Sequence, residues 1–286
     1  MLDALIDPFR LELAQRALLE VVILGCACGP LGAWVVIYRQ SYAAESIAHA
    51  ALPGLVLATL AGAPLALGAA GGLLVAALAI ALASRDEAIG SDLGVAVVVT
   101  TLFGAGALLA LSPEVPARLS SILFGDPLSI SSTDLALSAA LTTGILIALA
   151  GKHRSLALSA FDRPVALSLG ARPGRVDAVL LVLIALTTLV AVQALGNLLV
   201  VALLIGPGAA ALRLRDRLVP VLVLAAVIAV GCGIAGLYAS YHLNLAAGAA
   251  IALVAVLVFV ASVILTRQPA SAPRPRSPIG ALDAQG

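Results

Sequence analysis

Residues 219–241 read VPVLVLAAVIAVGCGIAGLYASY, a stretch without a charged side chain that follows the basic cluster at 213–217. A helix needs about 20 mostly apolar residues to cross the hydrocarbon core of a bilayer. This stretch meets that requirement and ends next to the polar residue His242. It is therefore predicted to be a transmembrane helix.

Eight further stretches share this pattern and are bounded by charges, prolines or glycine clusters. They lie near 14–38, 42–62, 64–84, 89–111, 133–151, 177–195, 197–212 and 246–266. Of the 286 residues, 62% are hydrophobic and only 11% are charged, too little polar surface for a water-soluble domain. The sequence predicts an all-α, polytopic membrane protein of eight to nine transmembrane helices, with one permease-like domain at 14–266.

Lys and Arg residues give the orientation, because basic residues in short loops stay on the cytoplasmic side of a membrane. Thirteen of the 16 fall at alternate boundaries of the predicted spans, beginning with Arg39 and Arg85 and ending with Arg267, Arg274 and Arg276. This alternation fits nine spans, with the N-terminus outside and the C-terminus in the cytoplasm.

The two ends of the chain differ from the spans in composition. Residues 1–13 contain Asp3, Asp7 and Arg10, so they lack the uninterrupted apolar core of a signal peptide and are predicted to form an interfacial segment. Residues 267–286 are rich in Pro, Ser and Arg and cannot bury enough apolar surface to fold. They are predicted to be a disordered cytoplasmic tail.

The connection at 112–133 is assigned to the outside and is longer than a turn. Pro116 is a helix start signal and Gly125 is a helix stop signal, so a short outer helix is predicted at about 116–125. Such a helix could gate an outer vestibule or simply lie on the membrane surface.

The connection at 151–177 is assigned to the cytoplasm. Asp162 is suited to cap a helix, Pro164 falls in its first turn and Gly170 ends it, which predicts a short amphipathic helix at about 162–170. A helix of this kind can dock in a groove of a partner protein, or it can be a plain interfacial helix.

Glu45 and His49 are the main ionisable residues at membrane depth, where each costs at least about 2.5 kcal/mol. They are four residues apart and are predicted to share one face of the span at 42–62 with Tyr42 and Ser46. One interpretation is a site for a passing cation. The other is a hydrogen-bonded pair that locks two helices together.

Proline at position 53 lacks the N–H that would bond to the carbonyl of residue 49, so a kink and a hinge are predicted at Pro53 and Gly54. A carboxylate, an imidazole and a free carbonyl suit Zn²⁺, Mn²⁺ or Fe²⁺, and the absence of a thiolate argues against Cu⁺. Two side chains cannot complete a shell, so other helices, water or the kinked backbone must add ligands. The ion would be a transported substrate, and no permanently bound cofactor is expected.

Weaker candidates could line a pathway or merely bridge helices. They are Asp92, Gln193, Asn197 and His242. Glu20 is expected to extend to the membrane interface, and His153 is expected in a solvated cytoplasmic loop between two basic residues. Pro207 lies between two glycines and is predicted to interrupt its helix, as a kink or a hinge.

Several functions lack support in the sequence. There is no Gly-x-x-x-x-Gly-Lys-Ser/Thr loop, so any ATP must be hydrolysed by another chain, and there is no Gly-x-Ser-x-Gly motif of a hydrolase. The net charge of +1 gives no indication of nucleic-acid binding. The chain is expected to be a transport subunit without enzymatic activity of its own.

The run RQSYAAESIAHAALPG at 39–54 resembles a motif of the ABC-3 permeases, which import zinc, manganese or iron(II). Weaker similarities to this family are found in other parts of the chain. They lie at 123–125, at 161–162 with 169–170, and at 196–207.

This resemblance implies a permease of the bacterial cytoplasmic membrane that works as a homodimer or as a pair of related permeases, with an extracytoplasmic metal-binding protein. It also implies an ion pathway past Glu45 and His49. Two cytoplasmic ATPases would dock on the 162–170 helix through Asp162, Arg163, Leu167, Leu169 and Gly170. The family more often has Asp where this chain has Glu45, and the extra methylene affects the choice between zinc and manganese.

Two alternatives stay open at this point. A permease of similar plan could carry an iron chelate or cobalamin, whose large substrate would not require a Glu/His pair. A proton-coupled carrier would instead cycle Glu45 or His49 through protonation and would need no ATPase.

Overall fold

The computed structural model describes residues 12–83, 91–112, 131–195 and 197–266, and this part of the chain is helical without a β-strand. In chain order the helices are α2 (Glu12–Ile37), α3 (Ser41–His49), α4 (Ala51–Leu60), α5 (Leu65–Ala83), α6 (Ser91–Ala110), α8 (Ser132–Phe161), α9 (Arg163–Ser168), α10 (Pro173–Leu195), α11 (Asn197–Leu214), α12 (Leu218–Leu243) and α13 (Ala247–Leu265). The all-α prediction is confirmed.

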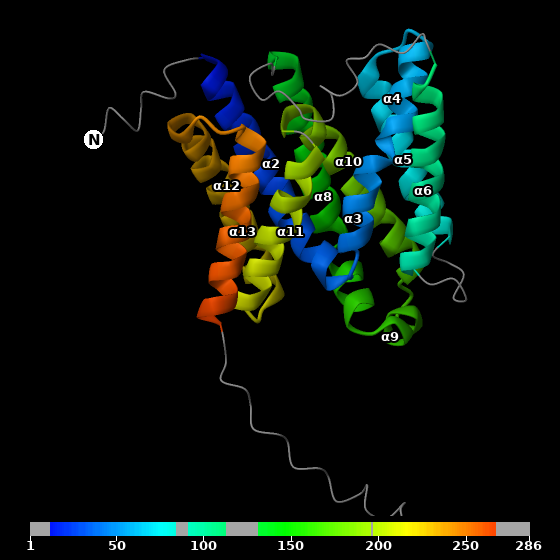
Figure 1. Cartoon of the computed structure of the whole chain (residues 1–286). Helices are drawn as coiled ribbons and strands as arrows, with labels where there is room; N and C mark the ends of the chain where they lie inside the picture. Colours follow the sequence, from blue (N-terminus) through cyan, green and yellow to red (C-terminus); the bar gives the residue numbers. More distant parts are fainter. Residues whose placement is uncertain (1–11, 84–90, 113–130, 196, 267–286) are drawn as a thin grey trace, which may run out of the picture.

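Within the described ranges, eight segments are long and apolar enough to cross a membrane, with α3 and α4 counted as one. The shorter apolar helix at 200–214 in α11 corresponds to the seventh predicted span, which was expected to be short. Helix α2 begins at the top of Figure 1 and α13 ends at the bottom, as an odd number of crossings requires. The protein is a multi-pass membrane protein.

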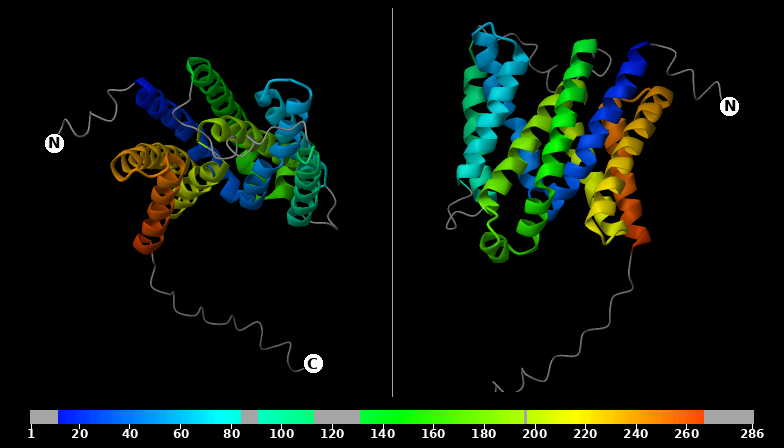
Figure 2. Two further views of the ribbon diagram at one scale, coloured as in Figure 1. Left: turned by 45° about the horizontal axis from the view of Figure 1, so that its top comes forward. Right: turned by 180° about the vertical axis from the view of Figure 1, so that it is seen from behind.

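The helices form two groups with a middle layer between them (Figures 1 and 2). Helices α2, α11, α12 and α13 pack on one another at one side, and α4, α5 and α6 pack together at the other side. Helix α10 joins the groups, because it contacts α2, α3, α5, α8 and α11. The large buried side chains include Trp34 of α2, Ile47 of α3 and Ile184 of α10, so the core lies where α10 packs against α2 and α3.

Glycines allow the helices to approach one another closely, as expected for spans rich in small residues. A side chain at Gly54 in α4 would collide with the backbone of Gly68 in α5, and one at Gly72 would meet the carbonyl of Ala50. Gly71, on another side of α5, faces open space. The close contact of α5 with α4 therefore uses Gly68 and Gly72, which are four residues apart and fall on one side of a helix.

Prolines act differently in two helices. The second span breaks at Ala50 between α3 and α4, and Pro53 lies in the first turn of α4, where its missing N–H costs little. Pro207 lies inside α11, which continues as one helix on both sides of it. The break near Pro53 was therefore placed correctly in the chain, and the kink or hinge at Pro207 stays a prediction within a helix that continues through it.

Helix α8 extends ten residues beyond its predicted end at 151. A capping box between Ser131 and Asp134 fixes the start of α8, and Asp162 is the C-cap residue that follows its last residue. No proline lies between Gly151 and Phe161, so α8 continues without a break past the predicted end of the span. Its 30 residues correspond to about 45 Å.

Three predictions lie outside the described residues. They are the interfacial segment at 1–13, the outer helix at about 116–125 and the disordered tail at 267–286. Of the first segment only Glu12 and Leu13 are described, and they belong to α2.

Candidate functional site

Helix α3 presents Tyr42, Glu45 and His49 on one open face of the chain. Tyr42 is 47% exposed, and Glu45 and His49 are also exposed. The three residues are separated by three and four positions, which aligns them along one side of a helix. Ser46 was expected on the same face but is buried, because the opposite side of α3 packs into the protein.

Phe103 of α6 borders this open face, and sequence reasoning did not identify it. The rings of His49 and Phe103 meet edge to face with centroids 6.1 Å apart. Nothing in the sequence marks Phe103, because only the packing of α3 on α6 brings the two rings together. Glu45 and His49 lie about 6 Å and about 12 Å along the helix from Ser41, well inside the span.

The segment above His49 is held firmly by α5 and α6. Pro53 and Gly54 are buried, and a side chain at Gly106 of α6 would collide with Pro53. Gly54 likewise lies directly against Gly68 of α5. The two residues predicted as a hinge are thus located at the start of α4, next to the break at Ala50.

The chain by itself offers an incomplete set of ligands. Among the described residues, no three His, Cys, Asp or Glu side chains gather into a metal-binding group. Glu45 and His49 supply one carboxylate and one imidazole, which suit a borderline divalent ion. The remaining ligands for such an ion must come from water, the backbone or another chain.

The structure does not bring the other ionisable candidates next to this pair. Asp92 lies in the first turn of α6, about 16 Å along the helix from Phe103. His242 is exposed near the end of α12, where it contacts Tyr238 and Tyr241. The side chains of Gln193 and Asn197 lie outside the described part.

Helix α9 occupies the segment where a short cytoplasmic helix was expected. The Asp162 carboxylate accepts a hydrogen bond of 3.0 Å from the backbone N–H of Val165 and so caps the helix. Gly170 has φ +80°, which is the left-handed conformation that glycine adopts easily at a helix end. The outer side of this segment is apolar, since Phe161, Leu167 and Leu169 are all strongly exposed.

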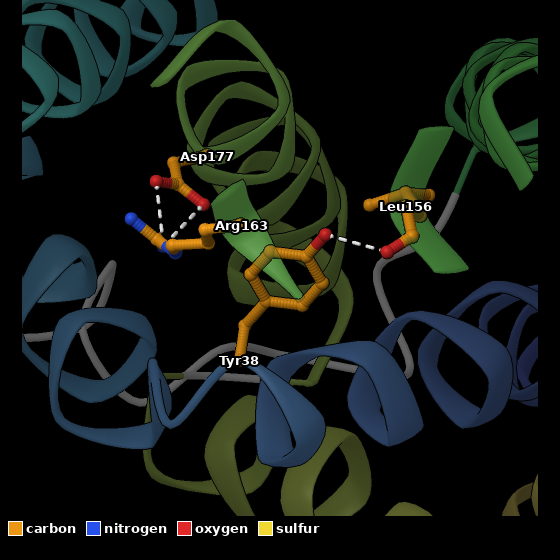
Figure 3. Close-up of polar contacts among 4 residues, drawn as sticks. All are labelled: Tyr38, Leu156, Arg163 and Asp177. Carbon is orange, nitrogen blue, oxygen red and sulfur yellow. Dashed lines mark hydrogen bonds and ion pairs between the residues drawn. The ribbon is translucent and has the colours of Figure 1, made fainter. Parts of the chain in front are cut away.

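Polar contacts connect α9 and the end of α2 to neighbouring helices (Figure 3). One guanidinium nitrogen of Arg163 lies 3.1 Å and 2.9 Å from the two carboxylate oxygens of Asp177. The Tyr38 hydroxyl donates a 2.8 Å hydrogen bond to the carbonyl of Leu156. Of these four residues the sequence pointed to Arg163 alone, because both pairings depend on how the helices pack on one another.

Two expectations about polar residues of the helices are wrong. Glu20 does not reach the interface: it is 1% exposed and accepts a 2.6 Å hydrogen bond from the Ser138 hydroxyl of α8. His153 does not lie in a solvated loop, because α8 continues past it and packs its ring edge-on against Trp34, with centroids 5.8 Å apart. Both residues face a neighbouring helix, and no local pattern reveals that direction.

A family model of the ABC 3 transport family matches residues 10–266, which includes nearly all of the described helices. The chain belongs to the ABC 3 transport family. Among similar proteins, the probable iron transport system membrane protein of Haemophilus influenzae is 33% identical over 91% of this chain and 96% of its own length. The manganese transport system membrane protein MntC of Halalkalibacterium halodurans is 35% identical over 86% of this chain and 84% of its own length.

Solved structures agree with this ABC 3 assignment. PsaBC from Streptococcus pneumoniae, solved in complex with Fab, is similar at a TM-score of 0.80 and 28% identity, over 92% of this chain and 95% of the matched chain. An inward-facing metal-chelate type ABC transporter has a TM-score of 0.68 at 15% identity, over 88% and 86% of the two chains. The second likeness shows a shared fold alone.

Proposed function

We propose that this chain is the membrane permease of an ATP-driven importer of divalent metal ions, with Mn²⁺ or Zn²⁺ as substrate. The observation that carries the proposal is the open face of α3, where Glu45 and His49 are exposed within a membrane span. The named functions of the relatives, manganese and iron transport, support a metal ion as the substrate.

A second permease chain completes the site in this proposal. A carboxylate and an imidazole facing hydrocarbon would cost several kcal/mol, about 2.5 kcal/mol or more for the carboxylate alone. Covering this face with a second copy or a related permease removes that cost and adds a second set of ligands. The ion then passes between the two chains, past Tyr42, Glu45 and His49.

Helix α9 is the docking element for a cytoplasmic ATPase in this proposal. This segment carries exposed apolar side chains, with Phe161 before α9 95%, Leu167 within it 61% and Leu169 after it 64% exposed. It lies at the bottom of Figure 1, the end assigned to the cytoplasm by the basic residues. Hydrolysis of ATP in the partner would drive alternating access to the metal site. An extracytoplasmic metal-binding protein would deliver the ion to a bacterial cytoplasmic membrane.

Metal uptake by cells that carry Glu45→Gln or His49→Ala tests the proposed site, with zinc and manganese measured side by side. Even an outer-shell partner of a metal site contributes about 10- to 100-fold, so we expect each variant to lose at least about tenfold in uptake of the transported metal.

Ser46→Ala is the matched control for this uptake experiment, because Ser46 is next to Glu45 but buried on the other side of α3. It should transport normally. Undiminished uptake of both metals in Glu45→Gln and His49→Ala would rule out the proposed site. Metal uptake that persists without any ATPase would instead favour a proton-coupled carrier.

A further inference from the structure

The cytoplasmic ends of α2, α8 and α10 are tied together beside α9 (Figure 3). Arg163 is the first residue of α9, and Asp177 lies in the second turn of α10. Their ion pair closes the turn between the two helices, since 14 residues separate the partners in sequence. A displacement of α9 is therefore passed to the base of α10.

The end of α2 is attached to the base of α8 by two contacts. The Tyr38 hydroxyl donates to the buried carbonyl of Leu156, and one turn earlier the Trp34 ring meets the His153 ring. Trp34 and Tyr38 are four residues apart, and His153 and Leu156 are three apart. Both contacts therefore join one face at the end of α2 to one face of α8. Two successive contacts fix the orientation of the α2 end on α8.

The corner between α2 and α3 is short and well defined. Arg39 has φ +57°, and the N–H of Gln40 bonds to the carbonyl of Val35 at 2.9 Å. Helix α3 begins directly afterwards at Ser41, and the N–H of Ala44 bonds back to the carbonyl of Gln40. Since no flexible linker intervenes, α3 must follow the end of α2, and it also packs directly on α10.

We propose that Tyr38 and Asp177 are positioning residues that join α9, the bases of α8 and α10, and the start of α3 into one mechanical unit. Through this unit a push on α9 moves the helix that carries Glu45 and His49. The inference rests on the proposed function and adds the route by which docking reaches the metal site. Tyr38 and Asp177 are not among the residues proposed to bind the ion or the ATPase, although Asp177 pairs with Arg163 at the start of α9.

The ion pair between Arg163 and Asp177 can link α9 to α10 without contributing much to the stability of the fold. The Arg163 side chain is 59% exposed and that of Asp177 is 21% exposed. An ion pair with this much solvent contributes little to stability. Removing the Asp177 charge should therefore leave the fold and the ATPase docking intact while weakening the connection between α9 and α10.

The test uses the complete permease–ATPase complex in liposomes, with Tyr38→Phe, Asp177→Asn and the double variant. The measured quantity is the number of metal ions transported per ATP hydrolysed. Coupling between distant sites is typically worth 5- to 150-fold, so we expect the double variant to lose at least about fivefold in this ratio. The single variants should fall in between, and Asp177→Glu, which keeps the carboxylate, should stay close to wild type.

Three further measurements make the result specific. Co-purification with the ATPase, the melting temperature and metal binding should remain unchanged in Tyr38→Phe and Asp177→Asn. Glu12→Gln is the matched control, because it breaks a 2.6 Å ion pair with Arg16 at the other end of α2. It should keep the wild-type ratio.

The outcomes distinguish this proposal from the proposed function. A wild-type ratio in both single variants and in the double variant overturns the linkage and leaves the metal site untouched. Normal uptake by Glu45→Gln and His49→Ala overturns the metal site regardless of the linkage result. If the double variant does not fold, a wild-type ratio in the two single variants is sufficient to reject the linkage.

Discussion

Glu20 shows at the scale of one residue how this protein accommodates a carboxylate in a membrane span. It lies two turns into α2, and its side chain is covered by α8, so it cannot reach the membrane surface. One carboxylate oxygen accepts a hydrogen bond from Ser138, and the other is buried and has no hydrogen-bond partner among the described residues. Its environment is therefore the packed interior, in contrast to the open face that carries Glu45.

Substitutions of Glu20 should separate hydrogen bonding from charge. Glu20→Ala leaves the Ser138 hydroxyl without its acceptor and opens a cavity between α2 and α8, which should lower the free energy of unfolding by about 2 kcal/mol or more. Glu20→Gln keeps an acceptor oxygen and should stay within about 1 kcal/mol of wild type. Thermal unfolding of the two purified variants checks this, and equal stability of both would show that the hydrogen bond contributes nothing.

At the scale of one element, α9 has an apolar surface that its own chain leaves uncovered. Only Ala166 on this helix is buried among its described neighbours, whereas Val165 and Leu167 face outward. The cap at Asp162 holds the first turn of this helix in place. A partner groove would cover them at little entropic cost, since the helix is already formed.

Leu167→Asp should weaken binding of the ATPase, because it places a charge in the centre of the proposed docking surface. A hot-spot side chain of an interface contributes about 2 kcal/mol or more, so a loss of at least about tenfold in affinity is expected. Co-purification of the complex from detergent measures it. Leu167→Met keeps an apolar side chain and is the matched control. Equal recovery of the ATPase with both variants would place the docking surface elsewhere.

For the whole molecule, the position of the α3 face decides how the chain assembles. Helices α4, α5 and α6 flank it on one side, and α10 packs behind it. The face is open in the single chain although it carries Glu45 and His49. In the proposed function, assembly with a second permease chain would complete the metal site and would also bury this surface.

Crosslinking tests this arrangement in membranes. Tyr42→Cys, in a Cys26→Ser background, should form a dimer with a short bismaleimide, because Tyr42 lies on the face that meets the second chain. Cys28 and Cys232 are buried and should not react. Leu78→Cys, which is exposed on α5 away from this face, is the control and should stay monomeric. Monomers only from Tyr42→Cys would exclude this face as the interface between two copies.

Local patterns in the sequence were sufficient for the helices and for the residues that end them. Mostly apolar stretches of about 20 residues predicted the spans, because each helix must satisfy its own backbone in lipid. Asp162, Pro164 and Gly170 marked α9, because caps and turns depend on neighbouring residues. Pro53 marked the break before α4 for the same reason. The run at 39–54 pointed to the ABC 3 family, which the match over residues 10–266 then showed.

Tertiary structure alone decided which direction each polar side chain faces. Helical spacing placed Ser46 on the face of Glu45, and Glu20 was expected to extend to the membrane interface, but the packing of α3 and α8 buries both Ser46 and Glu20. The pairs Tyr38–Leu156 and His49–Phe103 join residues distant in sequence. In a chain whose spans are apolar all round, no stripe of hydrophobic residues distinguishes the protein side of a helix from the lipid side, so only the packed fold assigns it.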